Sequence, residues 1–90
     1  MNWGMIERFV DTSGWAELVD RTLLFHSLAV AAFDEVWNQG GRLITTNLIF
    51  IELTALLTSP LRMPKTQQIQ LMGDLQTDPS VDVVFIDSAL

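Results

Sequence analysis

The chain has 90 residues and a formal net charge of −6, with 49% hydrophobic and 18% charged residues. This length allows one domain, spanning residues 1–90, and the high apolar content excludes an intrinsically disordered chain. The sequence has no cysteine and one histidine, which excludes disulfides, thiolate metal sites and multi-histidine zinc sites within one chain. Eleven acidic against five basic residues argue against a broad basic surface for nucleic acid, but not against carboxylates that meet phosphate through a metal ion.

No segment has the features of a signal peptide or of a membrane-spanning helix. Residues 1–7 lack a basic start and a long apolar stretch. The most apolar run, Leu43 to Leu57, is interrupted by Glu52 and is shorter than the ~20 residues that a spanning helix needs. We therefore expect a cytoplasmic protein without a membrane partner.

The first part of the chain predicts a strand followed by helices. An apolar stretch over residues 6–10 leads into Asp, Thr, Ser and Gly at positions 11–14, which is typical of a buried strand and its turn. Residues 15–20 have room for one or two helical turns. Apolar residues at steps of three and four then predict a helix over residues 21–39, which ends at a pair of glycines. The aromatic residues at helical spacing are expected in the core: Trp15, Phe25, Phe33 and Trp37.

The middle of the chain predicts a second strand and two more helices. Residues 42–45 form a short strand, and Thr46 or Asn47 can cap the helix that follows, to about residue 58. After a loop, Pro64 at a first helical turn opens another helix, which extends to about residue 76.

The last part of the chain predicts a third strand and, with it, the fold class. Residues 81–86 are apolar enough for a strand that is buried on both faces, and Asp87-Ser88 is typical of the cap of a further helix. Helical crossovers between short apolar strands imply a parallel sheet covered on both faces, that is, a three-layer α/β/α fold. Because a buried strand and a helix cap at the end of a chain are unusual, we expect a fragment of a longer protein or a surface that another chain covers.

Asp11 is the first candidate for a functional residue. It lies where the first strand ends, and open parallel sheets bind ligands outside the carboxyl ends of their strands, at the point where the strand order reverses. The alternative is structural, because Asp followed by Thr and Ser is common at helix N-caps.

Glu52 is the second candidate. Its neighbours three and four positions away on a helix are all apolar: Leu48, Ile49, Ala55 and Leu56. A carboxylate on such a face is costly to bury unless it is paired or bound to a cation, and the alternative is a face that is solvated at one end. Together, Asp11 and Glu52 predict a site for a hard cation such as Mg²⁺ or Mn²⁺, for which two acids are a minimum.

The remaining polar candidates are weaker. Asp20 and His26 lie near the start of a helix, where a solvated side chain is the simpler interpretation. Asp87 follows the third strand and could be the phosphoacceptor of a signalling receiver, although an N-cap is the simpler explanation. A receiver also needs an acidic pair after the first strand, and here Thr12 and Ser13 follow Asp11.

These residues together resemble the PIN-domain family, in particular ribonucleases of the VapC toxin type. The similarity is carried by the segment 9–13 with Asp20 and His26 after it, by the segment 42–47 with Glu52-Leu53 after it, and by the segment 83–87. It extends over nearly the whole chain, in order and with fitting spacing. The most specific part is the combination of the Asp-Thr-Ser turn, Thr-Thr-Asn and a Glu that we expect to be buried.

The resemblance implies a Mg²⁺- or Mn²⁺-dependent endoribonuclease, commonly the toxin of a toxin–antitoxin pair. Its partners would be an RNA substrate and an antitoxin protein. Asp11 and Glu52 would match the first two metal-binding, catalytic acids of the family, and Thr12 and Ser13 the polar residues beside the first. Thr46 and Asn47 would shape the start of the helix that carries Glu52.

The sequence departs from the family in one respect. The family's later acids lie after the third strand, and this sequence ends before that segment, so it resembles the first two-thirds of a PIN domain. Three hypotheses remain: a PIN-type endoribonuclease, a catalytically inactive relic that acts only as a protein-binding module, and, last, a receiver-like domain. Whether this chain is itself an enzyme stays open at this point.

The resemblance also implies an open sheet edge. The first strand is central in the family's sheet, and the strands on one side of it would be missing here. Arg8, Phe9 and Val10 would then present an unpaired apolar edge, so we expect a homo-oligomer or a tendency to aggregate.

Overall fold

The computed structural model describes residues 6–87 of the chain. Strands and helices follow one another in the order that the sequence predicts. The elements are β1 (Glu7–Phe9), α1 (Thr12–Val19), α2 (His26–Asn38), β2 (Arg42–Thr46), α3 (Asn47–Thr58), α4 (Lys65–Thr77) and β3 (Val81–Val84). The protein is thus a mixed α/β protein.

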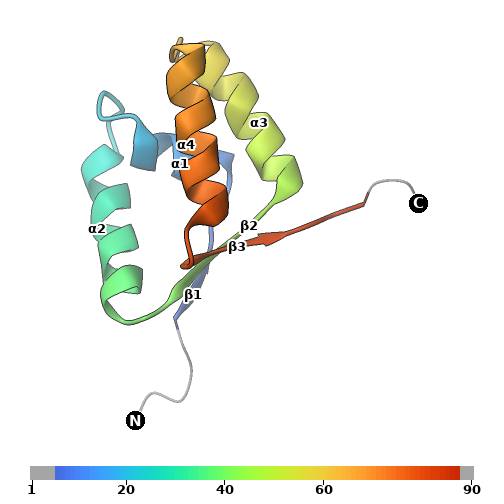
Figure 1. Ribbon diagram of the computed structural model, residues 1–90. Helices are drawn as coiled ribbons and strands as arrows, with labels where there is room; N and C mark the ends of the chain where they lie inside the picture. The colour runs from blue at the N-terminus through green and yellow to red at the C-terminus, as the bar shows by residue number, and fades with distance from the viewer. Residues whose placement is uncertain (1–5, 88–90) are drawn as a thin grey trace.

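The three strands form a parallel sheet in the order β1-β2-β3. This order has a consequence for the helices. Two successive crossovers in the same direction, each right-handed, place their helices on the same face of the sheet. Figure 1 shows this arrangement, with all four helices on one side of the strands. The prediction that helices cover both faces of the sheet is therefore wrong for residues 6–87. It failed because the strand order could not be read from the sequence.

The other face of the sheet is open. It carries alternate residues of each strand, and among them Phe9 is 65% and Val84 is 50% exposed. Arg42 and Asp82 form an ion pair on this face, which raises the pKa of the Arg42 guanidinium. The expectation that the first and third strands are buried is wrong for the same reason: each has a helix-covered face and an open one.

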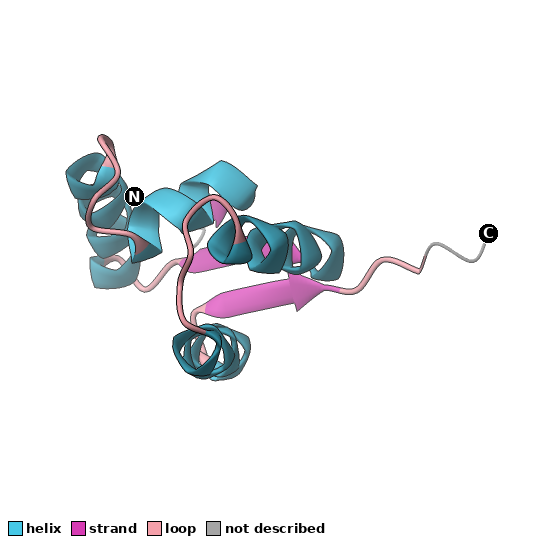
Figure 2. Cartoon of the chain, turned by 90° about the horizontal axis from the view of Figure 1, so that it is seen from above, coloured by secondary structure: helices cyan, strands magenta, loops and turns pink. Residues whose placement is uncertain are grey.

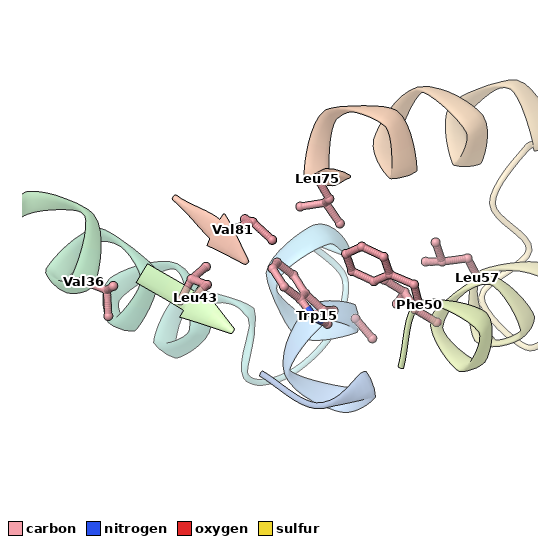
Figure 3. Close-up of a cluster of buried hydrophobic side chains, with 9 residues drawn as sticks. Trp15, Val36, Leu43, Phe50, Leu57, Leu75 and Val81 are labelled. Atoms are coloured by element: carbon pink, nitrogen blue, oxygen red, sulfur yellow. The ribbon is translucent and has the colours of Figure 1, made fainter. Parts of the chain in front are cut away.

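The core lies between the covered face of the sheet and the four helices. Figure 3 shows the buried side chains converging from α1, α2, α3, α4 and two strands. Trp15 is fully buried and contacts Phe50 edge to face, with 5.9 Å between the ring centroids. Its indole Nε1 donates a hydrogen bond of 3.0 Å to the hydroxyl of Thr45, which is also fully buried. Trp15 therefore joins α1 to β2 and α3.

Two of the four aromatic residues expected in the core lie outside it. Phe33 packs against the core, but Phe25 is 53% and Trp37 is 49% exposed. Helical spacing identified one apolar stripe of α2 correctly, since Val36 is buried. The spacing could not show which residues of that stripe pack against the sheet and which remain exposed.

The helix α2 begins at His26 and not at residue 21 as predicted. The carboxylate of Asp20 accepts hydrogen bonds from the backbone N–H of Thr22 (2.9 Å) and from its hydroxyl (2.7 Å). Such side-chain bonds to nearby backbone groups compete with the helix and hold a turn instead.

β3 ends at Val84, two residues earlier than predicted. Beyond its end, a side chain of α3 bonds to the backbone of the segment that follows β3. The side-chain amide of Asn47 accepts a hydrogen bond from the N–H of Ile86 (2.7 Å) and donates one to its carbonyl (3.2 Å). Figure 2 shows the segment after β3 leaving the body of the chain. Asp87 lies in this segment and is not helical; Ser88, its expected partner in a helix cap, lies outside the described residues.

None of the helices within residues 6–87 is long and apolar enough to cross a bilayer.

Candidate metal-binding site

Asp11 caps helix α1. Its Oδ1 accepts hydrogen bonds from the backbone N–H of Gly14 (2.8 Å) and from the hydroxyl of Ser13 (3.1 Å). The side chain is exposed, and no hydrogen bond within residues 6–87 involves its Oδ2. The capping role that the sequence left open is therefore confirmed. It fixes Oδ1 of the carboxylate just beyond the end of β1.

Glu52 is exposed on α3, whereas the sequence predicted a largely apolar environment for it. The buried residues of this helix are Phe50, Leu53 and Leu57, and they point away from Glu52 toward the core. The apolar neighbours that suggested burial are themselves partly solvated, and Leu48 is 40% exposed. The argument from desolvation therefore does not apply to Glu52.

The structure nevertheless brings Glu52 to the start of helix α1, which Asp11 caps. The hydroxyl of Thr12, the residue after Asp11, donates a hydrogen bond of 3.2 Å to Oε1 of Glu52. Thr12 is the first residue of α1, and Glu52 lies in the second turn of α3, so this bond links two helices at the carboxyl ends of β1 and β2. The side chains of Thr12 and Glu52 thus meet near the carboxyl ends of these strands, and Ser13 and Asp11 are bonded to each other at the start of the same helix.

Local sequence explains how α3 is placed for this contact. The hydroxyl of Thr46 accepts a hydrogen bond of 3.1 Å from the N–H of Ile49 and so caps α3. β2 therefore passes directly into α3 without a loop, which holds the second turn of the helix close to the sheet edge. Of the two capping candidates in the sequence, Thr46 is the cap, and Asn47 binds the segment after β3 instead.

The other candidate residues do not join this site. Asp20 holds the turn before α2, and Nδ1 of His26 lies 2.7 Å from the carbonyl oxygen of Glu17. Asp82 is paired with Arg42, and Asp87 follows β3. Within residues 6–87, no three His, Cys, Asp or Glu side chains gather closely enough to hold a metal ion. A metal site at Asp11 and Glu52 would therefore have only these two acids among residues 6–87.

Asp20 gives a prediction about pH. Hydrogen bonds from the hydroxyl and the backbone N–H of Thr22 lower the pKa of the Asp20 carboxyl, with a smaller contribution from His26. Because the pKa of Asp20 is lower in the folded protein than in the unfolded chain, where it is about 4, these hydrogen bonds stabilise the fold at pH values above about 4. The stabilisation is lost as the pH falls through the pKa of the folded state.

We therefore expect Asp20→Asn to be less stable than the unaltered protein at pH 6, with the difference shrinking below about pH 4. Urea denaturation between pH 6 and pH 2.5 measures it. Asp34→Asn, at an exposed acid on α2, is the matched control. A difference that stays constant down to pH 2.5 would show that Asp20 does not act through its charge.

Comparison with known proteins found no match: no family model, no curated protein and no solved structure matches the chain.

The hydrogen bond between Thr12 and Glu52 joins residues that are 40 positions apart. The sequence pointed to Thr12 and Glu52 separately, but no sequence signal predicted the hydrogen bond between them.

Proposed function

We propose that the chain is a metal-dependent endoribonuclease of the PIN type, in which Asp11 and Glu52 hold a Mg²⁺ or Mn²⁺ ion. The observation that supports the proposal is the hydrogen bond from Thr12 to Glu52, which joins Glu52 to the residue after Asp11 near the carboxyl ends of two parallel strands. Open α/β sheets bind their ligands outside the carboxyl ends of the strands, at the point where the strand order reverses; the order β1-β2-β3 within residues 6–87 contains no such reversal, so only the position at the carboxyl ends supports the proposal. The resemblance of the sequence segments around these acids to PIN domains supports the same assignment.

The residues at this site fit a hard divalent cation. Both acids are exposed, so neither is committed to a buried ion pair, and oxygen is the donor that Mg²⁺ and Mn²⁺ prefer. Mg²⁺ commonly takes only one or two protein carboxylates and keeps several waters. When bound, such an ion polarises the scissile phosphate and activates water.

The chain's own residues would orient the ligands. Ser13 and the N–H of Gly14 hold Oδ1 of Asp11, which leaves its other oxygen for the ion. Thr12 fixes Oε1 of Glu52 in the same way. Both acids thus have one restrained oxygen, and this reduces the entropy that is lost when a ligand binds.

The negative charge of the protein limits how RNA can be held. Arg8 lines the same cavity as Asp11 and is a cation near the site that can meet a phosphate. Few further bases are available against the net charge of −6, so affinity for RNA would depend on the bound ion. We therefore expect binding that is weak without a divalent ion.

Cleavage of a structured RNA with Mn²⁺, with Mg²⁺ and with EDTA tests the proposal. We expect slow cleavage, close to the limit of detection, because two carboxylates leave the ion loosely placed and an error of ~1 Å can reduce the rate about 100-fold. Any cleavage should require the metal and should be lost in Asp11→Asn and Glu52→Gln, but not in the control Asp34→Asn.

Cleavage that persists in EDTA, or in both active-site variants, would contradict the proposal. Metal binding with no cleavage at all would favour the alternative, a catalytically inactive PIN relic that acts as a protein-binding module.

A further inference from the structure

The outer edge of β3 presents backbone groups that no other strand within residues 6–87 pairs with. On the inner side, the carbonyl of Ser80 accepts a hydrogen bond of 2.7 Å from β2, and the backbone of Ile86 bonds to the side chain of Asn47. Because bonding alternates along a parallel strand, the N–H and carbonyl groups of Val83 and Phe85 point away from β2. Strands added beside β1 would leave this edge unchanged, since β3 lies at the opposite end of the order β1-β2-β3.

The residues along this edge are apolar and exposed. Positions 83–86 are Val, Val, Phe and Ile, and Phe85 is the most exposed of them, at 77%. Native edge strands are usually protected against association by lysine, proline or an inward-pointing charge. This stretch contains no lysine and no proline, and the carboxylate of Asp82 on β3 is paired with Arg42. The composition therefore favours an edge that another strand covers.

A groove beside this edge suits a second copy of the chain. It has a volume of about 730 Å³ and lies between α3, α4 and the carboxyl half of β3, with Phe50, Ile51 and Met72 in its apolar wall. Among the described residues, none that lines the groove is charged. A protein with a net charge of −6 repels its own copies over most of its surface, and this repulsion is weakest at an uncharged groove.

The sequence of the edge is complementary to itself about a two-fold axis through Val84. In this antiparallel register, Val83 faces Phe85 of the second copy, and the two residues exchange both of their outward backbone hydrogen bonds. The axis repeats this pair, so the outward groups of both residues are satisfied in each copy. On the open face, Asp82 lies opposite Ile86 of the second copy, so no like charges face each other.

The same register places an aromatic ring over the groove. Val83 and Phe85 both line the groove, on the helix-covered face that also carries the buried Val81. Residues directly opposite each other on two antiparallel strands are in side-chain contact, and a pair of an aromatic and a β-branched residue is favourable. The ring of Phe85 from the second copy would therefore lie beside Val83, at the mouth of the groove.

We propose that the outer edge of β3 pairs with the same edge of a second copy, which makes a dimer with one continuous sheet. Each copy places the ring of Phe85 over the groove of the other. The assembly closes at two copies, because each chain uses this edge once. The proposal goes beyond the nuclease function: it assigns self-association to β3 and not to β1, and it needs neither metal nor RNA.

Sedimentation velocity of the full chain in EDTA, over a range of concentrations, tests the proposal. We expect an equilibrium between monomer and dimer, with no larger species. Val84→Lys and Val84→Glu each place two like charges opposite each other at the axis, so each should weaken the dimer at least tenfold. An equal mixture of the two variants should dimerise again, because lysine then faces glutamate across the axis.

Ile69→Lys is the matched control, because Ile69 is exposed on α4 but does not line the groove. Phe85→Ala lies outside β3 and should also weaken the dimer at least tenfold, which keeps the test valid if the charged variants fail to fold.

Several results would overturn the proposal. A monomer at every concentration up to about 1 mM would do so. So would a dimer that the variants at positions 84 and 85 leave unchanged, a mixture of the two Val84 variants that stays monomeric, or a loss that follows Ile69→Lys. Species that grow beyond a dimer with concentration would exclude pairing about a closed two-fold axis.

Discussion

Replacing Trp15 with alanine is expected to destabilise the protein by about 3–5 kcal/mol. The side chain is fully buried, and its removal leaves a cavity between α1, β2 and α3 that neighbouring side chains can only partly fill. It also leaves the buried hydroxyl of Thr45 without its donor, although that hydroxyl still donates to the carbonyl of Val10 at 3.1 Å. A domain of this size has only roughly 5–13 kcal/mol of stability, so the variant loses a large part of it.

Urea denaturation followed by far-UV circular dichroism measures this effect. Trp37→Ala is the matched control, because Trp37 is 49% exposed and should change the stability by less than about 1 kcal/mol. Trp15→Phe should fall between the two, since it keeps much of the packing and loses the hydrogen bond. Equal losses for Trp15→Ala and Trp37→Ala would show that Trp15 is not the centre of the core.

Divalent metal is expected to stabilise the protein against heat. A ligand that binds only the native state stabilises it by mass action, by about 1.4 kcal/mol at ten times its Kd. For a domain of this size that is a rise in Tm of roughly 5–10 °C. Differential scanning fluorimetry with Mn²⁺ and Mg²⁺ measures this rise.

The double variant Asp11→Asn, Glu52→Gln should abolish the rise. These substitutions are chosen because they keep the acceptors that cap α1 and bind Thr12 while they remove both charges. Alanine at position 11 would instead remove an N-cap and lower stability by about 1 kcal/mol for an unrelated reason. A metal-induced rise that survives in the double variant would show that these acids are not the ligands.

The sequence predicted the identity and order of the elements well, because their signals are local. The caps at Asp11 and Thr46 and the glycine pair after α2 each act within a few residues, although α1 begins at Thr12 and not at residue 15, because the predicted turn at residues 12–14 is helical. The arrangement of the sheet depends on which strand lies beside which, and no local pattern carries that information. For this reason the open face with Phe9 and Val84 was predicted as buried.

The sequence predicted the residues of the candidate site but not whether they are buried or exposed. Apolar residues surround Glu52 on several sides of α3, so the sequence could not show which side of the helix faces the core. The structure turns Glu52 outward and joins it to Thr12. The bonds between Asn47 and Ile86 were missed for a related reason, because a side-chain amide that pairs with a distant backbone has no periodic signal.

The most direct test of the proposed metal site is a titration of the protein with Mn²⁺, followed by the electron paramagnetic resonance signal of the free ion. We predict one bound Mn²⁺ per chain, lost in Asp11→Asn and in Glu52→Gln taken singly, and retained in Asp34→Asn. Mg²⁺ added in excess should release the bound Mn²⁺, because both ions prefer the same oxygen ligands. Binding that is unchanged in both single variants, or no binding at millimolar Mn²⁺, would contradict the assignment of Asp11 and Glu52 as a metal site.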